Sequence, residues 1–308
     1  MATRLYTHPI FLEHVTPPGH PERPDRLRAI DRVLDTEDFS GLVREQAPAG
    51  SRDSVFLAHP ADYLERIEEA APQTGIVRID ADTSMSPRSF EAALTAVGAA
   101  TAAVDAVCSG AADNVFVAAR PPGHHAERES AMGFCLFNNA AIAARHAQKA
   151  HGLERVAIVD WDVHHGNGTQ DIFWSDPSVL YASTHQMPLY PGSGARSETG
   201  AGNIVNAPLE PGSGSESFRE AFLSRVLPAI DGFSPDLIIV SAGFDAHRLD
   251  PLASINLEAD DFDWATGQLM ELAGRHGEGR LVSLLEGGYD LDGLAFSVAA
   301  HIGRMMRG

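Results

Sequence analysis

Two side chains of the types that bind metal ions, Asp162 and His164, stand two positions apart just after an apolar run. The run, residues 155–159, is typical of a buried strand. Alternate side chains of a strand point to the same side, so an extended chain would direct both groups toward one point. A carboxylate and an imidazole that converge in this way are suitable ligands for a transition metal. We therefore expect other segments to supply a third ligand, a base and a pocket at this point.

Polar side chains also follow three other predicted strands. These are His124 and His125 after the run 114–119, Asp245 after the run 236–240, and Tyr289 after the run 280–285. In a parallel sheet the carboxyl ends of the strands share one edge, where ligands bind. Four endings of this kind, together rich in metal-binding side chains, predict one common site.

The elements that must position these groups follow a repeated order of strand, polar loop and helix. Apolar residues at helical spacing predict helices near 24–34, 88–108, 140–150, 215–230 and 258–274. The repeat predicts an α/β fold with an open, mostly parallel sheet and helices on both faces. A Gly- and Pro-rich stretch, 185–202, is expected to be a long surface loop. Because no linker divides the chain, we expect a single domain over residues 1–308.

Composition narrows the class of protein. The chain has 308 residues, a formal net charge of −19 and two cysteines, Cys108 and Cys135. Two cysteines cannot form a disulfide framework, which favours a reducing compartment such as the cytoplasm. We expect no N-terminal signal and no membrane span, since no apolar run reaches about 18 residues. The absence of a basic patch argues against nucleic acid, and the acidity tolerates cationic partners.

Five segments together resemble the histone deacetylase family of the arginase-deacetylase superfamily, in the same order along the chain. They are Arg120 to Glu127, Gly133 to Cys135, Asp160 to Gln170, Ser241 to His247 and Leu285 to Tyr289. The resemblance extends from about Tyr6 to the C-terminal helix. The sequence around Asn167 and around Glu286 is similar to that of the class II branch of the family.

The resemblance implies a zinc-dependent amidohydrolase that removes an acetyl or other acyl group from the side-chain amine of lysine. Asp162, His164 and Asp245 would hold the metal ion and leave a position open for water and the substrate carbonyl. Two carboxylates and one imidazole suit Zn²⁺ and also Fe²⁺ or Co²⁺.

The resemblance also assigns catalytic roles. His125 would be the general base toward a metal-activated water, His124 its electrostatic partner, and Tyr289 the hydrogen-bond donor to the oxyanion. Asp160 would hydrogen-bond His124 and Asn167 would hydrogen-bond His125. A carboxylate favours imidazolium more than an amide does, so His125 is expected to be the more readily neutral base.

Ion sites and substrate-contacting positions follow from the same resemblance. A structural K⁺ or Na⁺ site would involve Asp160, Asp162, His164, Ser183 and Thr184, and a second one Phe173, Asp176 and Val179. The walls of a narrow substrate channel would be Phe134 and Tyr190 with Gly133, and its rim Leu252 and Asp82. Arg26 would line an internal exit for acetate. Hydroxamate inhibitors are expected to bind at the metal.

Three other functions compete with a lysine deacetylase. A binuclear manganese ureohydrolase needs an Asp two positions after His164, where this chain has Gly166. An acetylpolyamine amidohydrolase fits the negative charge, yet polyamine-specific members carry an acidic rim residue where this chain has Leu252. A non-catalytic acyl-lysine binding protein would lack the tyrosine, and Tyr289 is present. An acetyl-lysine peptide is therefore the favoured substrate, a small acetylated amine is the alternative, and homo-oligomerisation is left open.

Overall fold

Eight strands, all parallel, form the central sheet of the computed structural model, which describes residues 2–308. Their order across the sheet is β2-β1-β5-β10-β9-β6-β7-β8. The strands are β1 (Thr3–Thr7), β2 (Val43–Gln46), β5 (Asn114–Val117), β6 (Val156–Asp160), β7 (Val179–Gln186), β8 (Ile204–Leu209), β9 (Leu237–Ala242) and β10 (Leu281–Leu285). A separate antiparallel pair is formed by β3 (Val77–Arg78) and β4 (Ser84–Met85).

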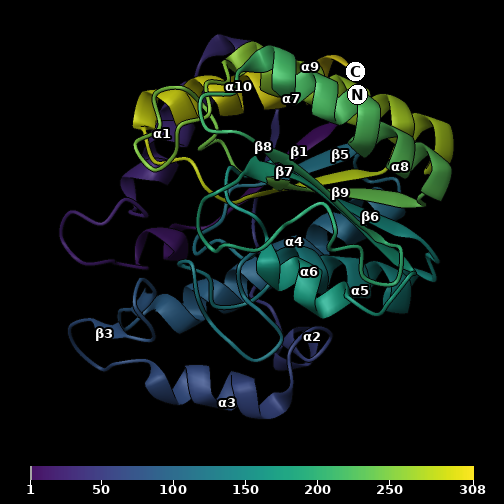
Figure 1. Cartoon of the computed structure of the whole chain (residues 1–308). Helices are drawn as coiled ribbons and strands as arrows, with labels where there is room; N and C mark the ends of the chain where they lie inside the picture. Colours follow the sequence, from purple (N-terminus) through teal and green to yellow (C-terminus); the bar gives the residue numbers. More distant parts are fainter. Residues whose placement is uncertain (1) are drawn as a thin grey trace.

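Helices cover both faces of this sheet (Figure 1). One layer contains α1 (Asp25–Leu34), α7 (Ser215–Ala221), α8 (Leu227–Phe233), α9 (Ala259–His276) and α10 (Leu291–Arg307). The other contains α4 (Ser89–Cys108), α5 (Asn139–His151) and α6 (Asn167–Phe173), with α2 (Arg52–Val55) and α3 (Ala61–Ala70) beyond it. Short 3₁₀ turns lie at η1 (Pro9–Leu12) and η2 (Glu37–Phe39). The predicted fold class is confirmed.

Local sequence explains where these elements begin and end. The β-branched runs of β6 and β9 are buried on both faces, as parallel strands between two helical layers require. The side chain of Asn138 caps α5 by accepting from the backbone N–H of Ala141 at 2.9 Å. Gly152 ends α5 in the left-handed conformation, at φ 69°.

The order of the strands brings distant segments together. β9 and β10 enter the sheet between β5 and β6, so the four strands that precede the predicted site residues are direct neighbours. Their register is continuous, because Val115 pairs with Val282, Val282 with Ile239, and Ile239 with Ile158. The carboxyl ends of all four strands therefore lie side by side.

Two edge strands and one helix differ from the sequence-based expectation. β2 and β8 were not predicted, because β2 is exposed and polar and β8 follows directly on a Gly-rich loop. The loop predicted at 185–202 begins later, since β7 extends to Gln186. The helix predicted at 215–230 is split into α7 and α8 by a π-helical turn, η3 (Phe222–Val226).

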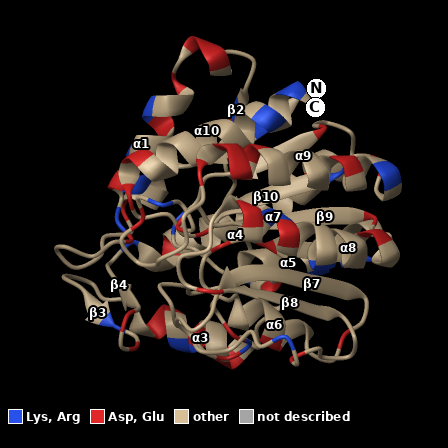
Figure 2. Ribbon diagram, turned by 45° about the horizontal axis from the view of Figure 1, so that its top comes forward, with Lys and Arg blue, Asp and Glu red and all other residues tan. Residues whose placement is uncertain are grey.

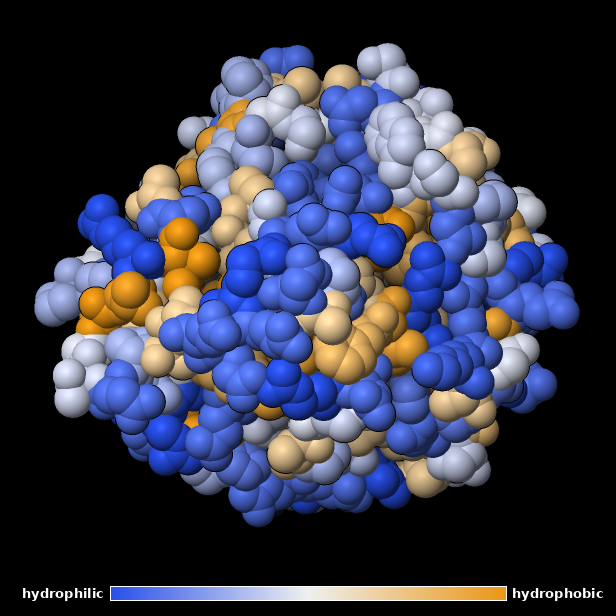
Figure 3. Space-filling view, turned by 90° about the horizontal axis from the view of Figure 1, so that it is seen from below, coloured by the Kyte–Doolittle hydropathy of each residue, from blue (hydrophilic) through white to orange (hydrophobic). Residues whose placement is uncertain are grey.

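Apolar side chains are mostly buried in the interior of the protein. The helix α4 is long and apolar enough to cross a membrane by length and composition, but 67% of its most apolar window is buried within the protein. Its small side chains pack against α5 and the sheet, which accounts for its hydropathy. Acidic residues are spread over helices and loops of both layers (Figure 2). On the face seen in Figure 3, apolar residues form small patches among hydrophilic ones.

His301 of α10 is a buried polar group that the predicted active site does not include. Its Nε2 contacts the Ser283 hydroxyl at 2.8 Å and its Nδ1 contacts the Thr266 hydroxyl at 2.6 Å. The Thr266 hydroxyl donates to the Phe262 carbonyl, so it accepts from Nδ1. Burial lowers the pKa of His301 from 6.5 to about 3, so the ring is neutral at pH 7 and its Nε2 accepts from the Ser283 hydroxyl.

We predict that replacing His301 by Gln flattens the acid side of the stability profile. The unfolded chain protonates this histidine near pH 6.5 and the folded chain near pH 3, so its contribution to the unfolding free energy is lost as the pH falls through this window. The difference amounts to about 1.4 kcal/mol per pH unit. Urea unfolding of both proteins at about pH 7 and about pH 5 measures it. An equal loss of stability in both proteins would refute the assignment.

Candidate active site

Four loops meet at the carboxyl edge of the sheet and contribute the candidate residues. The loop after β5 supplies His124 and His125. Asp160 is the last residue of β6, Asp162 and His164 lie in the loop that follows it, and Asn167 is the first residue of α6. Asp245 follows β9, and Tyr289 follows β10. All eight side chains are buried, with at most 8% of any residue exposed. The structure therefore brings together every residue that the sequence assigned to the metal and to catalysis.

Asp162, His164 and Asp245 form a group whose ligand atoms lie within 4.8 Å of one another. The Nδ1 atom of His164 lies 3.1 Å from Asp162 Oδ1 and 3.1 Å from Asp245 Oδ2. The expected cause of this convergence was wrong, because β6 ends at Asp160 and neither Asp162 nor His164 is in a strand. A tight loop brings them together instead: the backbone N–H of His164 donates to Asp162 Oδ1 at 2.9 Å.

This group has the properties of a site for a divalent cation. Two carboxylates are buried beside each other, and burial together with the charge of Asp162 raises the pKa of Asp245 to about 7. A bound cation would neutralise this repulsion, and a buried charge is stable only when it is paired. Backbone amides fix the opposite oxygens: Gly287 N–H donates to Asp162 Oδ2 and Val163 N–H donates to Asp245 Oδ1, both at 2.8 Å. The donor set of two carboxylates and one imidazole fits Zn²⁺, Fe²⁺ or Co²⁺.

His124 and His125 lie beside this group in contrasting environments. His124 Nδ1 contacts Asp160 Oδ2 at 3.0 Å, and Asp160 also accepts from the Tyr181 hydroxyl at 3.0 Å. Burial alone would lower the pKa of His124, but the charges of Asp160 and Asp162 raise it to about 10. Burial and the neighbouring charge of His124 lower the pKa of His125 well below its usual 6.5. The expected difference between the two histidines is therefore present.

The contact of His125 with Asn167 fixes the tautomer of a neutral His125. Asn167 donates through Nδ2 to Glu127 Oε1 at 2.8 Å, which leaves its Oδ1 as the acceptor that faces His125 Nδ1 at 2.8 Å. In a neutral His125 the proton is thus on Nδ1, and Nε2 has a free lone pair. Glu127 was not identified from the sequence as part of this arrangement.

A buried arginine packs against the face of the Tyr289 ring. The Arg26 guanidinium lies 5.0 Å from the centroid of the Tyr289 ring, and its Nε donates to the Gly288 carbonyl at 2.6 Å. The backbone N–H of Tyr289 donates to Asp250 Oδ2 at 2.7 Å. Burial raises the pKa of the Tyr289 hydroxyl well above 10, so the phenol keeps the proton that it would donate.

A second layer of contacts fixes Arg26 and the loop that contains the histidine pair. Arg26 donates to Glu22 Oε1 at 3.2 Å, and Arg120 binds the same carboxylate through two nitrogens. All three side chains are fully buried. The Glu286 carboxylate accepts from the backbone N–H groups of Gly123 at 2.7 Å and His124 at 3.1 Å. Neither Glu22 nor Glu286 was given a role from the sequence, although Glu286 lies within a matching motif.

The five residues predicted to form a substrate channel all line one cavity of about 190 Å³. The lining is Asp82, Gly133, Phe134, Leu189, Tyr190 and Leu252, with His125, His164 and Tyr289. Leu189 was missed, because nothing in the sequence distinguishes it from other apolar loop residues. The cavity thus leads to His125, to the candidate metal ligand His164 and to Tyr289.

Phe134 and Asp82 form one wall of this cavity through a strained turn. Phe134 has a positive φ of 69°, which is uncommon for a bulky residue. Its backbone N–H donates to the Thr83 hydroxyl at 3.0 Å, and the N–H of Gly133 donates to Asp82 Oδ1 at 3.0 Å. Asp82 therefore supports the turn that places the Phe134 ring, in addition to lying at the rim.

The residues expected at two monovalent-cation sites differ in their surroundings. Asp160 and Ser183 are paired on adjacent strands β6 and β7, and Thr184 follows. At the second site the carbonyls of Phe173, Asp176 and Val179 converge, but they accept from Asn203 Nδ2 at 2.9, 3.0 and 2.8 Å. Asn203 Oδ1 accepts from the N–H of Ala201, which fixes the orientation of the amide. An amide nitrogen thus lies where the second cation was expected, and a cation bound to these three carbonyls would have to displace it.

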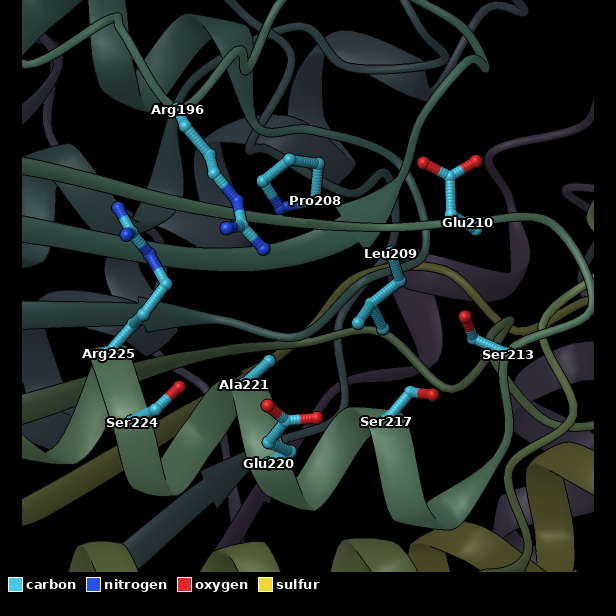
Figure 4. A pocket seen from close by; sticks show the side chains of 10 residues that line it. All are labelled: Arg196, Pro208, Leu209, Glu210, Ser213, Ser217, Glu220, Ala221, Ser224 and Arg225. Atoms are coloured by element: carbon cyan, nitrogen blue, oxygen red, sulfur yellow. The ribbon is translucent and has the colours of Figure 1, made fainter.

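A larger pocket, of about 440 Å³, lies elsewhere, between β8 and the helical segment from α7 to η3 (Figure 4). The side chains of Arg196 and Arg225 enter it from one end, Glu210 lies toward the other, and Glu220 lies between them on the helix. None of the candidate active-site residues lines it. Size alone therefore does not identify the reactive cleft of this protein.

Comparisons with known proteins agree with this geometry. The family model of the histone deacetylase domain matches residues 20–305. An uncharacterized protein of Synechocystis is 45% identical over 293 residues, which are 94% of each chain. A histone deacetylase-like amidohydrolase of Pseudomonas aeruginosa is 43% identical, over 89% of this chain and 74% of that protein. The crystal structure of the HDA15 HD domain superposes with a TM-score of 0.92 at 38% identity, covering 98% of this chain and 87% of the other.

We predict that Gly287→Ala removes metal binding without unfolding the protein. A Cβ atom at Gly287 would overlap the Oδ2 atoms of both Asp245 and Asp162, so the two carboxylates could not keep their positions. Bound divalent metal per chain, measured after dialysis, should fall to a small fraction of the wild-type value.

The matched control for this change is Gly274→Ala, because a Cβ at Gly274, on α9, meets open space. That variant should retain its metal, and circular dichroism should show that both variants are folded. A folded Gly287→Ala protein with a full complement of metal would contradict the proposed ligand geometry.

Proposed function

The chain belongs to the histone deacetylase family, and we propose that it hydrolyses the acetyl-amide of an acetylated lysine side chain with the help of a bound Zn²⁺ ion. The observation that supports this most directly is the single cavity that joins a neutral histidine, a candidate metal ligand and a protonated tyrosine. Amide hydrolysis needs a base for water, a proton for the departing amine and stabilisation of an oxyanion. These groups meet all three needs.

Asp162, His164 and Asp245 would hold the zinc ion. When bound, it would polarise the amide carbonyl and lower the pKa of the attacking water. His125 Nε2, left free by the Nδ1 contact to Asn167, would accept the proton of the water and return it to the amine as the C–N bond breaks. The Tyr289 hydroxyl would donate a hydrogen bond to the oxyanion.

His124 would act differently from its neighbour. Its contact with Asp160 keeps it protonated at neutral pH, since its pKa is raised to about 10. A protonated His124 makes protonation of His125 less favourable, because the ring centroids are only 4.0 Å apart. We infer that His124 supplies positive charge beside the reacting carbonyl and that His125 performs the proton transfers.

The channel suits a slender, mostly apolar chain that ends in an amide. Burial of each methylene of a lysine stem against Phe134 and Tyr190 contributes about 0.8 kcal/mol. Leu252 at the rim is apolar and would not attract a second cationic amine, which favours a peptide over a polyamine. The net charge of −19 and the partly buried carboxylate of Asp82 favour an acetylpolyamine instead, which is the alternative.

Further properties follow from the same proposal. We propose that K⁺ or Na⁺ binds near Asp160, Asp162, His164, Ser183 and Thr184, where the Thr184 hydroxyl is buried and has no hydrogen-bond partner among the described residues. Fe²⁺ or Co²⁺ could replace Zn²⁺ at the catalytic metal site, and hydroxamates should bind to the metal in that site.

The buried Arg26, which packs against Tyr289, could border a route by which acetate leaves. We also propose a class II-like enzyme of a reducing compartment, formed by one catalytic domain.

We predict that Tyr289→Phe lowers kcat on an acetyl-lysine peptide by about 100-fold or more, because a preorganised oxyanion donor is lost. KM and metal content should change little, since the hydroxyl is not a proposed metal ligand. Tyr6→Phe, which removes a hydroxyl from β1, is the control and should leave kcat unchanged. Steady-state kinetics on both variants measures the difference. Unchanged turnover in Tyr289→Phe would exclude the oxyanion role.

We predict a higher kcat/KM for an acetyl-lysine peptide than for acetylputrescine, because the rim residue Leu252 offers no charge to the second amine. Leu252→Glu should raise kcat/KM for acetylputrescine and leave the peptide value lower or unchanged. Measuring both substrates with both proteins, with and without a hydroxamate, separates the alternatives. A strong preference of the wild type for acetylputrescine would favour the polyamine function.

A further inference from the structure

A second group of metal-binding side chains lies outside the candidate active site. Asp105 of α4 and two histidines of α5, His146 and His151, place their ligand atoms within 4.8 Å of one another. The Nε2 atom of His146 lies 2.7 Å from Asp105 Oδ1, and the Nε2 atom of His151 lies 2.6 Å from the same oxygen. Both imidazoles therefore point to one place, beside one carboxylate.

The two helices hold these groups in a rigid arrangement. α4 and α5 pack directly against each other in the layer below the sheet (Figure 1). Asp105 is in the last turn of α4, and His151 is the last residue of α5, just before the C-cap Gly152. The negative ends of two helix dipoles thus lie close to the group, and they favour a cation there.

Topology separates this group from the catalytic centre. The helices α4 and α5 lead into the beginnings of β5 and β6, whereas the catalytic loops follow the ends of the same strands. The two groups consequently lie at opposite ends of the parallel strands, the second metal-binding group at the amino ends and the catalytic group at the carboxyl ends. Access also differs, because the Asp105 side chain is 54% exposed and those of His146 and His151 are 20% and 25% exposed, while the catalytic ligands are buried.

The donor set matches a first-row transition metal. Two imidazole nitrogens and one carboxylate oxygen suit Zn²⁺, Ni²⁺ or Cu²⁺, and solvent could fill the remaining position. Ligand atoms around a tetrahedral Zn²⁺ with bonds of about 2.0 Å are roughly 3.3 Å apart. The observed separations of 2.6 and 2.7 Å need an opening of well under 1 Å, which partly exposed side chains can make.

We propose that Asp105, His146 and His151 form a second metal site that binds a divalent transition-metal ion and ties the C-terminal ends of α4 and α5 together. The ion would displace the two histidine–carboxylate hydrogen bonds and leave the chemistry of the catalytic edge untouched. Its effect would be on stability, since an ion that binds only the folded chain raises the unfolding free energy by mass action.

The chain offers a natural control for an ordinary histidine–carboxylate contact. His276 Nε2 lies 2.7 Å from Asp231 Oδ1, and the second partner of that carboxylate is Arg275, whose Nη1 lies 2.8 Å from the same oxygen. An arginine has no lone pair for a metal, so one imidazole and one carboxylate remain. The His276–Asp231 contact has nearly the same length as the contacts of Asp105 with His146 and His151, but it offers one fewer ligand to a metal ion.

The test is Zn²⁺ binding to the intact protein with its catalytic metal retained and its channel closed by a hydroxamate. Isothermal titration and native mass spectrometry should show one additional Zn²⁺ per chain. His146→Gln and His151→Gln should each weaken this binding by at least about 100-fold, more than the loss of a group that merely orients a ligand. Asp105→Asn should also weaken it, and His276→Gln should not.

Thermal unfolding provides an independent readout. Added Zn²⁺ should raise the unfolding midpoint of the wild type and of His276→Gln, but not that of the double variant His146→Gln/His151→Gln. Circular dichroism without added metal establishes that the variants are folded. Equal Zn²⁺ affinity in the wild type and the folded double variant would overturn the proposal, whatever the outcome for catalysis. Loss of deacetylation with intact binding at this site would instead count against the proposed function alone.

Discussion

The placement of two carboxylates side by side in the protein interior is the constraint on which the active site depends. Asp162 and Asp245 follow neighbouring strands, β6 and β9, and both are buried. Such a pair is unfavourable without a compensating positive charge. Backbone amides of Val163 and Gly287 donate to the oxygens that face away from His164, so the oxygens beside His164 are the ones that would bind a cation. Gly287 has to lack a side chain, because any Cβ would occupy the space of the carboxylates.

A further carboxylate, Asp160, accounts for much of the difference between the two histidines. Asp160 contacts His124 and makes its protonation favourable. His125 instead faces the neutral amide of Asn167 and the positive charge of His124. Burial and the positive charge of His124 together lower the pKa of His125, so the two rings form one electrostatic unit. The orientation of Asn167, fixed by Glu127, completes this unit by holding the proton of His125 on Nδ1.

Much of this arrangement could be predicted from the sequence, because the strands β5, β6, β9 and β10 are apolar runs with distinctive polar endings. The sheet class, the helical layers and the residues around the metal followed from these endings and from the resemblance they carry. The edge strands could not be predicted, since β2 is short and polar and has no apolar pattern. Contacts such as that of Asn203 with three carbonyls depend on loop geometry, which side-chain type alone does not specify.

Residues near the N-terminus support the position of Tyr289 in the active site, although they lie far from it in the sequence. Glu22 is fully buried between Arg26 and Arg120, so one carboxylate is shared by two guanidinium groups and the three charges are retained together. Arg26 then has nitrogens left to hold the backbone on both sides of Gly287, at Glu286 and Gly288, and its face lies against the Tyr289 ring. Truncating Glu22 would leave two buried cations without an anion, which is far more costly than losing a surface ion pair. The position of the proposed oxyanion donor therefore depends on a residue more than 260 positions away in the sequence.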